Sequence, residues 1–241
     1  MVVDVIYNKY MMEKIRCFIM LKINILKGVK MIQLSNVNKC FGKKVVLSDI
    51  SLSINKNEFV CITGESGVGK TTLLNIIGLL EKPDSGEVIL EGKKQFNKKD
   101  ILKLRREFFG YIFQDYLLLP DKTVKENLSI SKYNDKKMDK RKLDEIMKKV
   151  GLDSSYLQKK VYYLSGGEQQ KVAIARMMLK PYKVVLADEP TGNLDYKNKT
   201  DVIKIFQDIK KEGKTIICVT HDKEVADSAD RVINLVKEKM C

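Results

Sequence analysis

The pattern Gly64-x4-Gly69-Lys70-Thr71 sets the strongest limit on how this chain can fold. A short apolar run, residues 58–63, leads directly into it, and an apolar pattern typical of a helix, residues 70–80, follows it. A glycine-rich loop between a strand and a helix directs backbone N–H groups and a helix N-terminus at one point, which suits a phosphate. By chance the bare pattern would occur in roughly one chain of this length in a hundred. The strand and helix on either side make chance a poor explanation, so we expect a nucleotide phosphate here.

The residues of this loop have separate expected roles. The loop backbone would curl around the β-phosphate, Lys70 would reach the β- and γ-phosphates, and the Thr71 hydroxyl would ligate Mg²⁺. The predicted nucleotide-binding residues of the loop are Gly64, Glu65, Ser66, Gly67, Val68, Gly69, Lys70, Thr71 and Thr72.

Two carboxylates follow a second apolar run, residues 184–187. Ligands of parallel α/β sheets bind at the carboxyl ends of strands, where Asp188 could hold Mg²⁺ through water. Glu189 is placed to orient or deprotonate an attacking water. Two solvated acids after a core strand would be common in themselves, but their pairing with the phosphate loop favours a catalytic site.

The order of elements predicts an α/β fold. Strands are expected at residues 31–37, 45–47, 50–54, 87–90, 184–187 and 215–219, with a turn at 38–42. Helices are expected at 70–80, 172–179 and 202–211. Strands that alternate with helices indicate a mainly parallel sheet. Residues 97–160 read as a basic helical block inserted into it, with Asn97 or Asp100 capping a helix. We therefore expect a helical subdomain at about 97–163 within a domain spanning 31–241.

Composition and charge limit the kinds of partner that we expect for this chain. The formal net charge is +14, but 39 lysines against 6 arginines indicate compositional bias rather than a surface built to grip nucleic acid. No run approaches the ~20 apolar residues of a membrane span. Five scattered cysteines favour a reducing compartment.

Residues 1–30 differ from the ordered pattern that begins at Met31. They could form a membrane-surface helix, a partner-docking arm, or an upstream in-frame extension that is not part of the native protein. We favour the last interpretation, because the ordered pattern starts at Met31 without a gap.

The run Leu164, Ser165, Gly166, Gly167, Glu168 resembles the signature of ATP-binding cassette (ABC) proteins. Other features match in order and spacing over about residues 31–235. Phe41 stands where that family has an aromatic that stacks on adenine, and Gln114 matches its glutamine loop. Residues 190–195 match the D-loop, and His221, the only histidine of the chain, matches the switch histidine.

The resemblance implies the fold of a P-loop NTPase of the ABC type, with a mainly parallel core sheet, an antiparallel β subdomain and an inserted α-helical subdomain. It implies ATP and Mg²⁺ as cofactors, and a head-to-tail dimer that holds ATP between the phosphate loop of one copy and the signature of the other. The catalytic residues would be Lys70, Gln114, Glu189 and His221, and the metal ligands Thr71, Gln114 and Asp188. The partner copy would contribute Ser165, Gly166, Gly167 and Glu168.

The motifs look most like the subgroup that serves macrolide, lipoprotein and bacteriocin systems. The expected function is ATP hydrolysis that energises a separate membrane permease, at the cytoplasmic face of the membrane, for export of a peptide or antimicrobial. A regulatory ATPase of the cell-division type is the alternative, and a soluble ABC protein acting on DNA or ribosomes is a weaker one. Tyr162 and Tyr163 depart from the run expected before the signature, and Lys171 stands where many relatives have arginine.

The run Asn97, Lys98, Lys99, Asp100 also matches the guanine-recognition motif of GTPases. It precedes a helical pattern here, so helix capping is the better explanation, and we expect ATP rather than GTP.

Overall fold

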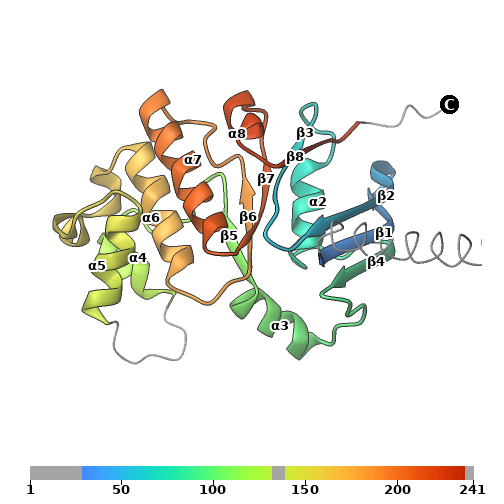
Figure 1. Ribbon diagram of the computed structural model, residues 1–241, viewed down its shortest axis with the longest axis horizontal. Helices are drawn as coiled ribbons and strands as arrows, with labels where there is room; N and C mark the ends of the chain where they lie inside the picture. Colours follow the sequence, from blue (N-terminus) through green and yellow to red (C-terminus); the bar gives the residue numbers. More distant parts are fainter. Residues whose placement is uncertain (1–28, 132–138, 237–241) are drawn as a thin grey trace, which may run out of the picture.

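The computed structural model describes residues 29–131 and 139–236 (Figure 1). They form two sheets with helices around them. The antiparallel sheet has the order β2-β1-β4, and the parallel sheet has the order β5-β6-β7-β3-β8. The segment 1–30 was predicted to be an N-terminal extension, and most of it lies outside the described residues.

The antiparallel sheet consists of β1 (Lys30–Phe41), β2 (Lys44–Asn55) and β4 (Ser85–Leu90). The sequence predicted two separate strands in this range, but β2 is one continuous strand. Asp49 lies between the two predicted segments and takes a left-handed conformation (φ 47°). Its carboxylate accepts a 2.6 Å hydrogen bond from the side chain of Asn36, which is also left-handed (φ 50°). Asp and Asn tolerate this region better than other residues, so the strand bulges there without ending. The predicted turn at 38–42 was placed too early, since β1 continues to Phe41.

The parallel sheet consists of β3 (Phe59–Thr63), β5 (Phe109–Ile112), β6 (Val184–Asp188), β7 (Thr215–Val219) and β8 (Arg231–Asn234). Strands β3, β6 and β7 are apolar and almost wholly buried, as expected for central parallel strands. The sequence prediction was wrong at β5, which lies inside the block expected to be helical. Phe109 pairs with Val184 and Ile112 with Ala187, so this strand is defined by its neighbour β6.

The helices are α2 (Lys70–Ile77), α3 (Lys98–Glu107), α4 (Val124–Ser129), α5 (Lys140–Lys149), α6 (Gly166–Met178), α7 (Tyr196–Lys211) and α8 (Lys223–Asp227). Two short 3-10 turns, Ser154–Gln158 and Val161–Tyr163, precede α6. The predicted cap of α3 is confirmed: Asn97 and Asp100 form a reciprocal capping box.

The helical part and the antiparallel sheet lie at opposite ends of the molecule. Figure 1 shows α4, α5 and α6 at one end, β1, β2 and β4 at the other, and the parallel sheet between them. Two buried apolar clusters correspond to this division, and both include residues of the parallel sheet. In the described ranges no helix has the length and apolar character needed to cross a bilayer.

Candidate nucleotide site

The glycine-rich loop between β3 and α2 is shaped by backbone conformations that favour glycine. Gly67 and Gly69 have φ values of 74° and 105°, and Gly69 caps the N-terminus of α2. A Cβ atom on Gly67 would meet nothing within 4 Å, so the loop is open on that side. Lys70 Nζ donates 2.9 Å hydrogen bonds to the carbonyl oxygens of Gly64 and Glu65. The ammonium group is therefore held over its own loop, where a phosphate would lie.

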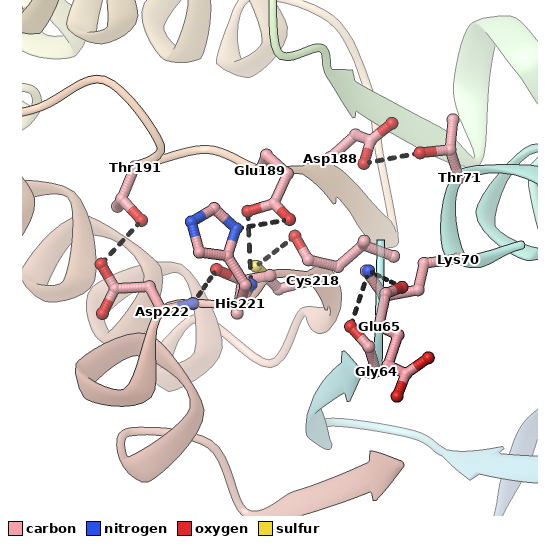
Figure 2. Close-up of polar contacts among 12 residues, drawn as sticks. Gly64, Glu65, Lys70, Thr71, Asp188, Glu189, Thr191, Cys218, His221 and Asp222 are labelled. Carbon is pink, nitrogen blue, oxygen red and sulfur yellow. Dashed lines mark hydrogen bonds and ion pairs between the residues drawn. The ribbon is translucent and has the colours of Figure 1, made fainter. Parts of the chain in front are cut away.

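Thr71 and Asp188 meet across the site, as Figure 2 shows. The Thr71 hydroxyl donates a 3.2 Å hydrogen bond to Asp188 Oδ1, which joins the start of α2 to the end of β6. Burial raises the pKa of Asp188, and the charge of Glu189 raises it further, while the Thr71 hydrogen bond and Lys70 oppose the rise. A nearby cation would stabilise the ionised form of a carboxylate in this setting.

Glu189 and His221 face each other at the ends of β6 and β7 (Figure 2). Glu189 Oε1 lies 3.0 Å from His221 Nδ1, and the backbone N–H of His221 approaches Glu189 Oε2 at 3.4 Å. Glu189 adopts a left-handed backbone (φ 44°), and its N–H donates to Val219 O at 2.9 Å. A non-glycine residue held in this region is strained, and such strain is frequent at functional sites.

One pocket of about 460 Å³ collects most of the predicted site residues. It is lined by Phe41, Lys44, Val46, Ser66, Gly67, Gly69, Lys70, Thr71, Thr72, Gln114, Glu189, Val219 and His221. Phe41 is 51% exposed, so its ring is available for stacking. The predicted residues Gly64, Glu65, Val68 and Asp188 do not line the pocket themselves. Val68 is buried in the core, and Asp188 reaches the site through Thr71.

Three residues that sequence reasoning missed also line this pocket: Lys44, Val46 and Val219. Lys44 and Val46 belong to β2, which follows the two-residue turn after Phe41. Their position depends on how the antiparallel sheet packs against the loop. The closest available signal was that Lys44 is only three positions from the predicted stacking residue.

The signature residues form a separate site at the N-terminus of α6. Ser165 accepts a hydrogen bond from the Glu168 N–H at 3.3 Å, and Glu168 Oε2 accepts one from the Ser165 N–H at 2.8 Å. The Tyr156 hydroxyl adds a 2.7 Å bond to Glu168 Oε1. Burial would raise the pKa of Glu168, but these hydrogen bonds outweigh it and lower the pKa. None of the four signature residues from Ser165 to Glu168 lines the pocket that the described residues form around the phosphate loop.

Contacts at its two ends connect the signature helix α6 to a neighbouring loop and to helix α7. Arg176 of α6 donates to the carbonyl oxygens of Leu117 and Tyr116, at 2.5 and 2.8 Å, and so holds the loop that follows Gln114. At the other end of α6, Gly167 packs directly against the side-chain amide of Asn198. Asn198 is in turn held by Asp195, the N-cap of α7.

The donor set fits the expected Mg²⁺. Thr71 and Asp188 place hydroxyl and carboxylate oxygens side by side, and Gln114 lines the same pocket with an amide. Hard cations such as Mg²⁺ take oxygen ligands, commonly one or two from protein together with water and phosphate. Among the described residues no group of three or more His, Cys, Asp or Glu could hold a metal.

Comparison with known proteins gives the family. The family model described as "ABC transporter" matches residues 47–192, which is more than half of the chain. The chain belongs to the ABC transporter family. As an ABC ATPase cassette, it is 40% identical over 216 residues to the "Lipoprotein-releasing system ATP-binding protein LolD" of Aquifex aeolicus (strain VF5), covering 88% of this chain and 96% of that protein.

This ABC cassette is also 43% identical over 209 residues to the "Macrolide export ATP-binding/permease protein MacB" of Campylobacter jejuni (strain 81-176), covering 85% of this chain. The chain spans about a third of the length of the MacB relatives, 33% in this case. Among solved structures it resembles the "Dimeric structure of a post-hydrolysis state of the ATP-binding cassette MJ0796 bound to ADP and Pi". The TM-score is 0.77 at 37% identity, covering 86% of this chain and 95% of the other. The predicted fold class, a P-loop ATPase of the ABC type, is confirmed.

Proposed function

We propose that this chain hydrolyses ATP as the motor subunit of an ABC transporter and energises a separate membrane permease. The observation that carries the proposal is the convergence of Lys70, Thr71, Glu189 and His221 on one pocket that also holds Phe41. Phosphate-binding, metal-binding and water-activating groups thus lie together with an aromatic ring for the base.

Each residue has a defined task in this mechanism. Phe41 stacks on the base, and the loop N–H groups with Lys70 bind the β- and γ-phosphates. Thr71, Asp188 and Gln114 would hold Mg²⁺, which supplies positive charge against the charge that develops on the phosphates. Glu189 orients the attacking water and accepts its proton. The backbone N–H of His221, 3.4 Å from Glu189 Oε2, helps to hold that carboxylate in place, and the imidazole hydrogen-bonds the γ-phosphate.

We infer that the working unit is a head-to-tail dimer. Ser165, Gly166 and Gly167 form a second helix start suited to an anion, and they do not reach the pocket of their own chain. In a head-to-tail pair, the signature of each copy would close the other copy's site. The dimeric structure of the MJ0796 cassette bound to ADP and Pi supports a dimer.

The test is Glu189→Gln, which keeps the shape of the side chain but removes its basicity. Hydrolysis should fall by about 10²–10⁴-fold, while ATP binding persists. With ATP bound but not hydrolysed, the variant should become dimeric in light scattering. Glu212→Gln on the surface serves as the matched control and should behave as wild type. A Glu189→Gln variant that binds ATP but stays monomeric would overturn the dimer.

For the permease contact we propose the surface beside Gln114. Leu117 and Leu119 follow the glutamine and are 55% and 49% exposed, and Tyr162 and Tyr163 lie close by at 48% and 71%. The Tyr162 N–H donates to Pro120 O at 3.1 Å, which joins the two segments. Exposed apolar side chains gathered in this way mark protein interaction sites. Leu119→Glu should abolish co-purification with the permease and leave the ATPase rate of the isolated chain unchanged.

We propose export of an antimicrobial peptide or bacteriocin as the transport function, at the cytoplasmic face of the membrane. The names of the relatives, which refer to lipoprotein release and macrolide export, support export as the direction and make lipoproteins and macrolides the competing cargoes. A regulatory role without cargo is the second candidate. A transport assay with the reconstituted permease separates the two, and a pull-down with nucleic acid should recover nothing.

A further inference from the structure

Asp222, next to the switch histidine, is held by an ion pair that the motifs do not explain. Lys199 Nζ of α7 lies 2.8 Å from Asp222 Oδ2, and the two side chains are only 20% and 13% exposed. Most other lysine pairs of the described chain are far more open; in the Lys149–Glu212 pair, for example, the side chains are 52% and 42% exposed. The hydrogen bond to Asp222 raises the pKa of Lys199, which keeps the ammonium charged.

The Asp222 carboxylate joins three parts of the site. It accepts from the Glu224 N–H at 2.9 Å and so caps α8, and it lies 3.5 Å from the Thr191 hydroxyl in the loop after Glu189. The Asp222 N–H donates to Thr220 Oγ1 at 3.0 Å. Figure 2 shows Thr191, Asp222 and His221 grouped beside Glu189. Lys199 adds α7 to this group.

The position of His221 depends on the contacts of Asp222 more than the position of a buried residue would. Its side chain is 70% exposed, so packing does not fix it, and its contacts to Glu189 come from Nδ1 and from its own backbone N–H. Both contacts require the backbone of residues 220–222 to stay in place. Removing Lys199 would leave the Asp222 carboxylate without its cation in a poorly hydrated position, from which it would tend to move toward water.

We propose that Lys199 is a positioning residue for hydrolysis, which holds Asp222 and thereby keeps His221 against Glu189. This inference rests on the proposed ATPase mechanism. Lys199 is not placed to touch the nucleotide pocket, since it does not line it. Its loss should therefore slow the chemical step without weakening ATP binding.

The experiment compares steady-state ATPase kinetics and ATP affinity for wild type, Lys199→Met, Lys199→Arg and Lys210→Met. Lys210 lies on the same helix and pairs with Asp230, away from His221, so it controls for loss of an α7 ion pair. We expect kcat to fall about tenfold in Lys199→Met, as misplacement of a catalytic group predicts, with KM and ATP affinity within about twofold of wild type. Lys199→Arg should restore most of the rate, and Lys210→Met should keep it.

Three results would overturn the inference without touching the proposed function. Two of them are a hydrolysing wild type with an equally active Lys199→Met variant, and equal losses in Lys199→Met and Lys210→Met. A rise in KM with unchanged kcat would also overturn it, because that pattern means a binding role. A wild-type protein that binds ATP but hydrolyses none would instead overturn the proposed function, and this inference with it.

Discussion

Gly167→Ala should destabilise the protein, and the effect should depend on Asn198. A Cβ atom on Gly167 would stand 2.5 Å from both Asn198 Nδ2 and Asn198 Oδ1, closer than real contacts allow. The Asn198 side chain is held in place by a 2.9 Å hydrogen bond from Nδ2 to Asp195 Oδ2. The new methyl group therefore fits only if Asn198 rotates away and gives up this bond.

Three contributions set the magnitude. Losing a partly exposed hydrogen bond costs about 1 kcal/mol, and crowding with a less favourable rotamer adds about 1 kcal/mol. Alanine is a better helix former than glycine by about 0.5–1 kcal/mol, and the first turn realises only part of that gain. The balance is a loss of about 1–1.5 kcal/mol, and for a chain of this size each kcal/mol lowers Tm by about 2–4 °C.

In an Asn198→Ala background the clash is gone, so only the helix contribution remains. Gly167→Ala should then be neutral or stabilising by up to about 1 kcal/mol, which reverses the sign. Thermal unfolding without nucleotide, followed by circular dichroism, measures all four members of the cycle. Gly192→Ala is the control, because its Cβ would meet its nearest atom at an ordinary 3.6 Å. Equal losses with and without Asn198 would refute the reasoning.

Three other outcomes are expected. Burial raises the folded-state pKa of Asp188, so its carboxylate opposes folding at neutral pH. Without Mg²⁺ and nucleotide, Asp188→Asn should therefore raise Tm at pH 7, and the gain should shrink as the pH falls through the folded pKa and vanish below about pH 3.9; a gain that persists there would contradict the assignment. Phe41→Ala should weaken ATP binding about tenfold in calorimetry, as loss of a base-stacking contact predicts, and leave binding of inorganic triphosphate unchanged. Deleting residues 1–28 should leave the ATPase rate and permease binding intact, whereas a deletion through residue 30 also removes the Val29 carbonyl that bonds the Lys56 N–H and should lower Tm.

That Lys70, Glu189 and His221 meet in one pocket could be predicted from sequence, because each of them lies in a motif that follows local rules. The chemistry of each motif can be inferred from a few neighbouring residues. The motifs are a glycine-rich turn, a strand that ends in two acids and a strand that ends near a histidine. The parallel topology then brings those strand ends to one edge of the sheet. The four-residue strand β5 could not be predicted in this way, because it is too short to show a period and is defined by pairing with β6.

The same limit applies to contacts between distant segments. Neither the packing of Asn198 on Gly167 nor the pairing of Lys199 with Asp222 has a sequence signal. Each depends on the path of α7 relative to α6 and β7, which only the folded chain determines. The sequence contains 39 lysines, and nothing in it distinguishes Lys199 from the others.

The position of β8 has a consequence for the protein while it is being synthesised. Ile233 and Asn234 pair with Ile62 and Thr63, and the Leu235 N–H donates to Thr63 O at 2.8 Å, directly before the phosphate loop. A Cβ on Gly64 would run into the Leu235 carbonyl, so this late segment forms part of the wall behind the loop. The phosphate loop therefore gains the support of this segment only after residues through Leu235 have left the ribosome. The emerging chain should therefore carry its glycine motif without retaining ATP until the segment through Leu235 has been made and has paired with β3.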